Sequence, residues 1–411
     1  MLKLAAAALA LALSAGVANA APDATLWREA QDAQPAALAL LRQAVDIDSG
    51  TGDAAGAQAV QALFAPRLRA MGFVVETAPS EAPGRTGPNL LATLAGSGRG
   101  RVLIVAHADT VFPAGTAAQR PFRIDGGRAF GPGVSDEKGG GVVALTALEL
   151  LRRGGWRDFG RITFLLESGE EIGSPGARQL IARLSREADV EFNMEPGDAP
   201  DAITVWRKGS RTFKIVVHGR AAHAGVDPQD GRNAAVELIH QLAPVDALPH
   251  AGDGLTANLT TLKAGDRVNV IPDLAAADVN VRVREEKQFA DVQRRLEADA
   301  RTPVVPDTRV EVLSDPAFPP LPTNPATDAL AARARAIYAE IGRPLAFAGN
   351  GGASESALAH LNGAAALDGL GPVGGGFHSD KEYLELSTFA PRIYLMARLL
   401  QEVGHAPPVR R

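Results

Sequence analysis

The chain has no cysteine among its 411 residues. This absence excludes disulfide bonds, thiolate metal ligands and a cysteine nucleophile. Aromatic residues make up only 5% of the chain, which leaves little material for stacking single-stranded nucleic acid. The formal net charge of -5 likewise gives no basic excess for binding a phosphate backbone. We therefore expect no nucleic-acid partner.

Long hydrophobic runs are also scarce, and the clearest one lies at the N-terminus. Lys3 is followed by an Ala/Leu-rich run that ends at Ala18-Asn19-Ala20. A positive start, a short apolar segment and an Ala-x-Ala site are typical of a secretory signal peptide. The alternative, an amphipathic first helix, would need a polar face that this run lacks. We predict a signal peptide over residues 1–20 and a secreted or periplasmic protein without membrane association after cleavage.

The length of 411 residues favours two domains. Apolar runs typical of buried strands alternate with helical patterns in the first half and again near the C-terminus. This alternation predicts an α/β domain with a mostly parallel sheet flanked by helices. Residues 206–315 instead have the order β-α-β-β-α-β of a split βαβ module. We predict this α+β domain as an insertion between residues 21–205 and 316–411 of the larger domain.

Histidines and carboxylates follow several predicted strands directly or open the predicted helix at 139–153. They are His107, Asp109, Asp136, Glu170, Glu171, Glu195 and His378. Because the carboxyl ends of parallel strands meet at one edge of a sheet, we expect these side chains to converge there. Each alone has an ordinary alternative, such as a solvated surface pair for Glu170 and Glu171. Their joint occurrence favours a metal site.

Two imidazoles and several carboxylates without sulfur suit zinc, with cobalt or manganese as possible substitutes. The set exceeds what one tetrahedral zinc ion needs, so we expect two ions that share a carboxylate. Two metals a few ångström apart can polarise a carbonyl and generate hydroxide at neutral pH. A remaining carboxylate beside that hydroxide would act as a general base.

The motifs around these residues resemble those of the M20 family of dizinc metallopeptidases, and within it the glutamate carboxypeptidase group. The motifs occur in the order His107-Ala-Asp-Thr, Gly131-x-Gly-Val-x-Asp-x-Lys-Gly, Glu170-Glu-Ile-Gly-Ser, Met194-Glu-Pro-Gly and Gly376-Phe-His-Ser-Asp. The resemblance covers nearly the whole chain after the predicted signal. It implies that His107 and Glu195 hold one zinc ion, that Glu171 and His378 hold the other, and that Asp136 bridges them.

The resemblance also implies three further roles. Asp109 would orient His107, as a carboxylate behind a metal-bound histidine usually does. Glu170 would take a proton from the bridging water and return it to the leaving amine. The inserted domain would serve as a lid and dimerisation domain, so a homodimer is expected. His223 in Gly219-Arg-Ala-Ala-His-Ala-Gly would stabilise the tetrahedral oxyanion, often from the partner subunit; an ordinary loop histidine is the alternative.

Substrate contacts are implied for Asn269, Arg282 and the Gly-rich loop at Gly352, although each could equally be structural. Glu355 in the same loop could simply be solvated. One position departs from the family: glutamate-selective relatives carry Arg where this chain has Asp315, in Ser314-Asp-Pro-Ala-Phe. A carboxylate cannot make the bidentate contact that Arg makes with a substrate carboxylate. Asp315 would disfavour a neutral or basic side chain on the released amino acid less than the acidic side chain of glutamate.

These expectations define the predicted function. The chain would be a secreted zinc carboxypeptidase that hydrolyses the amide bond to a C-terminal amino acid of a peptide or N-acyl conjugate. The alternatives are an N-acyl-amino-acid amidohydrolase of the same family, an aminopeptidase, and a non-catalytic metal- or ligand-binding periplasmic module. Glu170 distinguishes the last, because metal binding alone has no use for a base.

Overall fold

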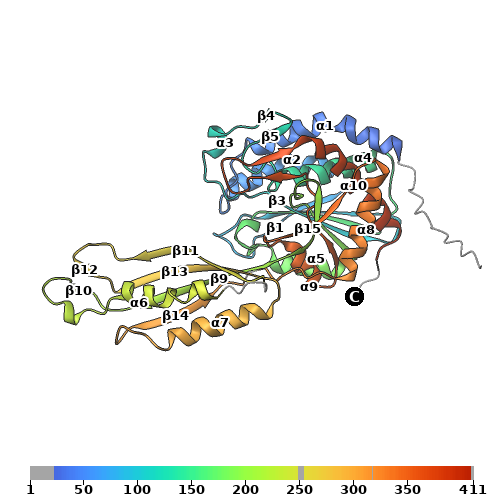
Figure 1. Cartoon of the computed structure of the whole chain (residues 1–411). Helices are drawn as coiled ribbons and strands as arrows, with labels where there is room; N and C mark the ends of the chain where they lie inside the picture. Colours follow the sequence, from blue (N-terminus) through green and yellow to red (C-terminus); the bar gives the residue numbers. More distant parts are fainter. Residues whose placement is uncertain (1–22, 249–253, 317, 409–411) are drawn as a thin grey trace, which may run out of the picture.

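The computed structural model describes residues 23–248, 254–316 and 318–408, so the predicted signal peptide lies outside the described residues. The chain forms a larger domain, called the catalytic domain because it carries most of the predicted site residues, and an elongated second domain that extends away from it (Figure 1). The second domain, residues 209–314, is here called the lid domain. Both the N-terminal and the C-terminal parts of the chain build the catalytic domain, so the lid domain is an insertion. Within the described ranges, no helix is long and apolar enough to cross a membrane.

The core of the catalytic domain is a six-stranded sheet of order β1-β2-β6-β3-β7-β16. Its strands are β1 (Val74–Ala78), β2 (Asn89–Ala95), β3 (Arg101–His107), β6 (Arg161–Glu167), β7 (Val190–Asn193) and β16 (Ala365–Leu367). The strands β6, β3, β7 and β16 are parallel, whereas β2 runs antiparallel to both of its neighbours. The α/β class is confirmed, but the sheet is mixed. No crossover helix joins β1 to β2, which permits their antiparallel pairing.

Helices cover both faces of this sheet because alternate strand residues point to opposite sides. On one side Ile104 packs with α1 (Ala24–Val45), α2 (Ala54–Ala70), α4 (Lys138–Arg153), α8 (Pro325–Glu340) and α10 (Leu386–His405). On the other side Leu103 and Val105 pack with α5 (Arg178–Glu187) and α9 (Glu355–Leu361). The helix α1 begins after Asp23, whose side chain accepts a hydrogen bond from Leu26 N at 3.0 Å and caps the helix.

Smaller elements surround the edge where the parallel strands end. The polar segment after His107 contains α3 (Thr116–Gln119), β4 (Arg123–Asp125) and β5 (Arg128–Phe130), which the sequence pattern did not predict. Together with β17 (Gly374–Gly375) and β18 (Tyr383–Glu385), β4 and β5 form a sheet of order β17-β18-β5-β4. This sheet joins the segment that follows His107 to the one that carries His378. The strands β8 (Ala202–Arg207) and β15 (Ala346–Asn350) pair in parallel near the start of the lid domain.

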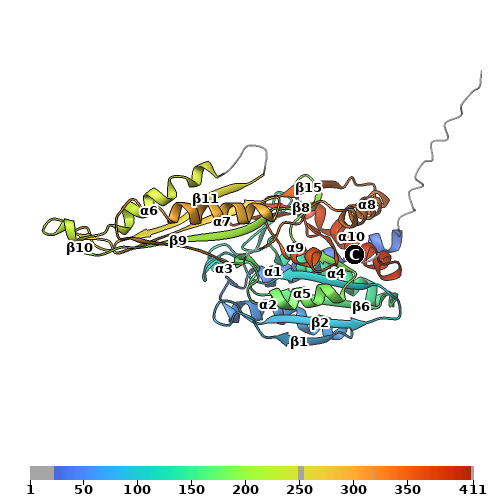
Figure 2. The same cartoon turned by 90° about the horizontal axis from the view of Figure 1, so that it is seen from below.

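The lid domain has the predicted β-α-β-β-α-β order. Its elements are β9 (Gly209–His218), α6 (Ala234–Leu242), β11 (Thr256–Ala264), β13 (Leu274–Val283), α7 (Lys287–Ala300) and β14 (Arg309–Ser314). The four strands form an antiparallel sheet of order β11-β13-β9-β14. Figure 2 shows α6 and α7 lying together along this sheet. At the end farthest from the catalytic domain, β10 (Ala222–His223) pairs with β12 (Val270–Ile271).

Candidate metal centre

The residues that follow the parallel strands meet at one edge of the central sheet. His107 is the last residue of β3, and Glu170 and Glu171 lie in η1 (Glu170–Ile172), a single 3₁₀ turn just after β6. Glu195 lies two positions after the end of β7. Parallel pairing of β3 with both β6 and β7 places these three strand ends side by side. The predicted convergence is therefore present.

Asp136 lies between two histidines. Its Oδ1 is 3.3 Å from His107 Nε2, and its Oδ2 is 3.3 Å from His378 Nε2. A second carboxylate accompanies each histidine: Glu195 Oε1 lies 3.6 Å from His107 Nε2, and Glu171 Oε2 lies 3.2 Å from His378 Nε2. The five side chains thus form two half-sites that share Asp136.

The spacing within each half-site fits a bound metal ion. Two ligands about 2.0–2.1 Å from a tetrahedral zinc ion lie about 3.3 Å from each other. The ligand pairs here are 3.2–3.6 Å apart. Imidazole nitrogens and carboxylate oxygens without sulfur also match the chemistry of zinc, cobalt and manganese. The residues present therefore fit a pair of divalent ions.

The charges at the site also favour cations. Complete burial by itself lowers the pKa of His107, but Asp109, Asp136 and Glu195 raise it more strongly, so the pKa lies well above its usual value. Hydrogen bonds with Asp136 and Glu171 raise the pKa of His378 to about 10. In both cases the surrounding carboxylates attract positive charge. Divalent cations would satisfy the same carboxylates.

Asp109 fixes the orientation of His107 and the start of η1. The backbone oxygen of Asp109 lies 3.0 Å from His107 Nδ1, so Nδ1 can donate to it while Nε2 faces the site. The Asp109 carboxylate accepts hydrogen bonds from Glu170 N at 3.2 Å and from Glu171 N at 3.4 Å. Thr51 Oγ1 donates to the same carboxylate at 2.6 Å. Asp109 therefore fixes the position of His107 and of both adjacent glutamates.

Glu170 lies beside the two half-sites but belongs to neither of them. Its Oε2 is 4.0 Å from His107 Nε2, farther than the oxygens of Asp136 and Glu195. Burial, followed by repulsion from Glu195, raises the pKa of Glu170 well above its ordinary value. The side chain also lines the cleft that leads to the site. A carboxylate at this place can exchange a proton with a group in the cleft.

Comparison with known proteins agrees with this geometry. Residues 103–402 match the model of peptidase family M20/M25/M40, which is well over half of the chain. The chain belongs to this family. It is therefore a peptidase or amidohydrolase. The resemblance seen in its motifs is confirmed.

One relative supports the same assignment, and two solved structures share the fold. Carboxypeptidase G2 of Pseudomonas sp. (strain RS-16) is 36% identical over 403 residues, which cover 97% of each chain. A tripeptidase from Staphylococcus aureus has a similar structure, with a TM-score of 0.75 at 19% identity over 90% of this chain and 98% of that one. A dinuclear metal-binding M20 peptidase from Bacillus subtilis has a TM-score of 0.64 at 16% identity over 91% of this chain and 99% of that one.

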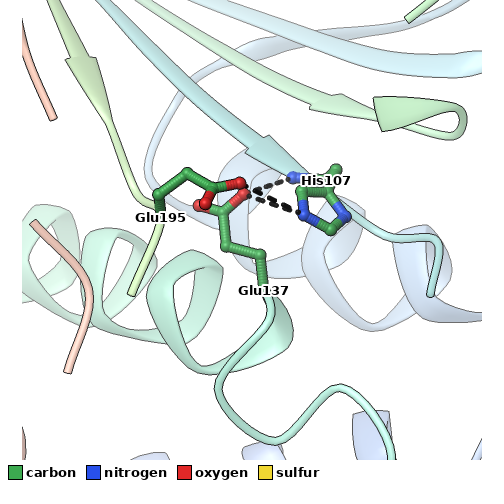
Figure 3. A group of neighbouring side chains, drawn as sticks. All are labelled: His107, Glu137 and Glu195. Atoms are coloured by element: carbon green, nitrogen blue, oxygen red, sulfur yellow. Dashed lines mark hydrogen bonds and ion pairs between the residues drawn. The ribbon is translucent and has the colours of Figure 1, made fainter. Parts of the chain in front are cut away.

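Glu137 is a further neighbour of His107 that the sequence pattern did not single out. Figure 3 shows its carboxylate beside His107 and Glu195. Its Oε2 accepts a hydrogen bond from His107 N at 3.1 Å and lies 3.5 Å from His107 Nε2. The side chain is fully buried. Its place next to Asp136, another adjacent pair of acids, was a signal that could have revealed it.

Arg207 is a second residue that was missed. It is buried at the end of β8, where Nη2 donates to Glu195 Oε2 at 3.2 Å. Its Nε and Nη2 also make bonds of 2.7 and 2.8 Å to the two oxygens of Asp368. This bidentate contact fixes the guanidinium, which in turn fixes the orientation of Glu195. Nothing in the local sequence links Arg207 to Asp368, since 161 positions separate them.

Glu355 is not solvated, so that alternative is wrong. It is completely buried at the start of α9. Its Oε2 accepts a hydrogen bond from Asn193 Nδ2 at 3.0 Å, and Asn193 Oδ1 accepts one from Glu195 N at 3.1 Å. Packing of α9 on β7 covers a side chain that looks like an ordinary loop acid in the sequence. Glu355 supports Glu195 through Asn193.

A cleft of about 740 Å³ separates the metal-site residues from the lid domain. Arg282 and Gly352, both expected near substrate, line it, and so does Asp315. Arg282 Nε donates to Asn280 Oδ1 at 2.9 Å, which directs the side chain along the sheet of the lid domain. A Cβ atom on Gly352 would lie 3.2 Å from Arg207 Nη1, so a larger residue would press on the support of Glu195.

His223 and Asn269 lie together, but at the far end of the lid domain and outside this cleft (Figure 1). Ala224 N donates to the backbone oxygen of Asn269 at 3.0 Å, which joins the two segments. The ring nitrogen His223 Nδ1 accepts hydrogen bonds from Gly225 N and Val226 N at 3.1 and 3.0 Å. In the neutral ring the proton is then on Nε2, which can donate. Within one described chain, however, this donor does not reach the metal-site residues.

Proposed function

We propose that this M20 chain is a dizinc hydrolase that cleaves the amide bond to a C-terminal amino acid of a peptide or N-acyl conjugate. The observation that carries the proposal is the arrangement of two histidines on opposite sides of Asp136, with Glu170 beside them at 4.0 Å from His107. A storage or binding site would need the ligands alone. The additional buried carboxylate facing the cleft gives the site a base.

His107, Glu195 and Asp136 would hold one ion, and His378, Glu171 and Asp136 the other. Two zinc ions at such a site polarise a carbonyl and lower the pKa of water. Glu170 would take a proton from the attacking water and return it to the nitrogen of the departing amino acid. Burial raises the proton affinity of Glu170, as a group that both accepts and donates a proton requires. Asp109 would keep the His107 ring oriented throughout.

The polar side of the cleft supports the release of an amino acid with a free carboxylate. Arg282 and Lys214 extend from neighbouring strands of the lid domain into the cleft. Cations at these positions can pair with a carboxylate. Asp315 lines the same cleft and would repel a second carboxylate on the substrate side chain. We therefore propose a released amino acid with a neutral or basic side chain rather than glutamate.

We also propose that the protein acts as a homodimer. The edge strand β11 and the helix α6 of the lid domain expose four large apolar side chains. Val236 and Ile239 on α6 are 50% and 64% exposed, and Leu259 and Leu262 on β11 are 47% and 51% exposed. An edge strand and a helix that both expose apolar side chains suit pairing with a second copy. Such pairing offers a route by which His223 and Asn269 reach the cleft of the partner.

Export to the periplasm or the medium stays a proposal that rests on the composition of residues 1–20. If the signal is processed after Ala20, the mature chain begins at Ala21. Mass spectrometry of protein recovered from an expressing bacterium would then give the mass of a chain that begins at Ala21. An intact N-terminus on the active protein would contradict export.

A substrate screen tests the proposed reaction. Purified protein loaded with zinc, cobalt or manganese would be offered dipeptides and N-acyl amino acids ending in Ala, Lys, Phe or Glu. The proposal expects metal-dependent release of the C-terminal amino acid, with Glu the poorest of the four. Equal cleavage of amides whose terminal carboxylate is blocked would contradict the assignment and favour an aminopeptidase.

A further inference from the structure

A second hollow adjoins the candidate metal centre through Glu171. It measures about 390 Å³, within the usual range of small-molecule sites. Three segments form it: the loop after α1, the loop after β3 and the turn η1. Its lining residues are Gly50, Thr51, Asp53, Thr110, Val111, Phe112, Pro113, Ala114, Glu171 and Ile172.

The hollow shares part of its wall with the cleft of the candidate active site. Glu171 and Ile172 line both the hollow and the cleft under the lid domain. Glu171 Oε2 is also the atom that lies 3.2 Å from His378 Nε2. A group placed in the hollow therefore lies next to the half-site that His378 and Glu171 form.

The walls of the hollow are apolar and held in place. Val111 and Ile172 are 41% and 45% exposed, which is unusual for such side chains beside an active site. Thr51 N donates to Thr110 O at 2.9 Å, and Thr110 N donates to Ser49 O at 3.0 Å, so the two loops are joined. The Arg120 guanidinium lies 4.4 Å over the Phe112 ring and supports that wall. The hollow is a formed surface rather than a gap between free loops.

Charge distinguishes the hollow from the cleft. The cleft contains the cations Arg85, Arg207, Lys214 and Arg282, and also the carboxylates of the metal-site cluster and of Asp278 and Asp315. The described residues that line the hollow include no Lys, Arg or His. Its two carboxylates are the metal-site Glu171 and Asp53, and Asp53 caps α2 by accepting from Gly56 N at 2.9 Å. The cleft therefore offers cations that can pair with a carboxylate, whereas the lining of the hollow offers none.

An amide substrate has two halves that leave the reacting carbon in different directions. Its amino-acid half carries a carboxylate that can pair with the cations of the cleft. We infer that the hollow binds the other half, and that this acyl group is uncharged and apolar, such as a medium-chain alkanoyl or an aroyl group. The inference rests on the proposed amide hydrolysis and specifies its acyl side. It disfavours dicarboxylic acyl groups such as succinyl.

Kinetics with one amino acid and several acyl groups tests the inference. The zinc-loaded protein would be given N-acetyl-, N-hexanoyl-, N-benzoyl- and N-succinyl-L-alanine. We expect kcat/KM for the hexanoyl and benzoyl compounds to exceed that for the succinyl compound by tenfold or more, because burial of several methylene groups is favourable. Equal or better cleavage of N-succinyl-alanine would overturn the inference.

A substitution in the wall ties the preference to the hollow. Val111→Asp should reduce kcat/KM for the hexanoyl compound about tenfold more than for the acetyl compound, since a charge is placed against the alkyl chain. Val74→Asp is the matched control: Val74 is 61% exposed on β1 and lines neither cavity. It should leave the ratio unchanged. An unaltered ratio in Val111→Asp, or a changed preference for the released amino acid instead, would contradict the assignment.

Binding separates this inference from the proposed reaction. Hexanoate and acetate, whose carboxylates would lie at the metal ions rather than in the hollow, would be titrated calorimetrically into the zinc-loaded protein and into Val111→Asp. We expect hexanoate to bind at least tenfold more tightly than acetate, and most of this difference to be lost in the variant. This measurement needs no turnover. If no amide is cleaved but hexanoate binds as expected, the reaction is wrong and the apolar site stands; equal binding of both acids would refute the site.

Discussion

Glu170 and Glu171 are adjacent residues with different surroundings. Glu171 Oε2 lies 3.2 Å from His378 Nε2, whereas the nearest histidine nitrogen recorded for Glu170 is His107 Nε2, at 4.0 Å. Both backbone amides donate to Asp109, so the turn holds the two side chains in fixed and separate directions. The difference in position, rather than in chemistry, gives one carboxylate the geometry of a ligand and the other that of a base.

Removal of His378 should empty one half-site and preserve the other. In His378→Ala, the ligands His107, Glu195 and Asp136 remain, so the zinc content should fall from two ions to one per chain. Hydrolysis should drop by about a hundredfold or more, because one of two charges that stabilise the transition state is lost. Elemental analysis after gel filtration, with parallel kinetics, measures both quantities.

His405→Ala is a suitable control for this change. His405 is exposed, pairs with Asp158 at 2.8 Å on the surface, and lines neither the cleft nor the hollow. Its removal should leave both the metal content and the rate unchanged. Two ions per chain in His378→Ala would show that His378 is not a ligand.

Among the elements, the loop before α4 depends on a residue from the far end of the chain. The Glu382 carboxylate accepts hydrogen bonds from Gly133 N, Ser135 N and Asp136 N at 2.9, 3.0 and 3.1 Å. The side chain is almost fully buried. It lies four positions after His378, so one short segment supplies a candidate ligand and also holds the loop of the bridging residue.

Glu382→Ala should therefore weaken both folding and metal binding. Three buried N–H groups would lose their acceptor, and each unsatisfied group costs about 1–3 kcal/mol. We expect the free energy of unfolding of the metal-free protein to fall by at least about 2 kcal/mol in urea titrations. Glu385→Ala, which removes a partially exposed partner of Arg128, should have a much smaller effect. Equal effects of the two changes would show that the three bonds contribute little.

The elements and most metal-site residues were predictable because their signals are local. Short apolar strands followed at once by His107, Glu170 or Glu195 indicate strand ends, and parallel pairing brings such ends together. Contacts between distant segments gave no such signal. Arg207 meets Asp368 across 161 positions, and the burial of Glu355 depends on α9 packing against β7. The antiparallel β2 was missed for the same reason, since strand direction depends on connections rather than on composition.

At the scale of the whole molecule, the position of His223 bears on whether one active site is built from one chain or from two. His223 lies on β10 at the far end of the lid domain, with its Nδ1 occupied by two backbone amides. The metal-site residues of the same chain lie in the catalytic domain. A dimer formed through α6 and β11 would bring a second lid domain alongside, and the partner could then supply the Nε2 donor that stabilises an oxyanion.

Complementation between two inactive variants tests this arrangement. A mixed dimer of His223→Ala and Glu170→Gln contains one site with an intact Glu170 and an intact His223 from the other chain. Activity should therefore reappear on mixing, toward one quarter of the wild-type rate per chain after equal, random exchange of subunits. If His223 acted within its own chain, the mixture would stay as inactive as its components. Light scattering would verify that dimers form.

The central claim is that the two metal half-sites and Glu170 together make a hydrolase. The most direct test is Glu170→Gln, with the zinc content and kcat measured on the same sample. Glutamine keeps the size of the side chain but cannot accept and return the proton. The account predicts two zinc ions per chain and a kcat reduced by about 10²- to 10⁴-fold. A near-normal kcat with both metals bound would contradict the assignment of Glu170 as the base, and loss of zinc would make it a ligand instead.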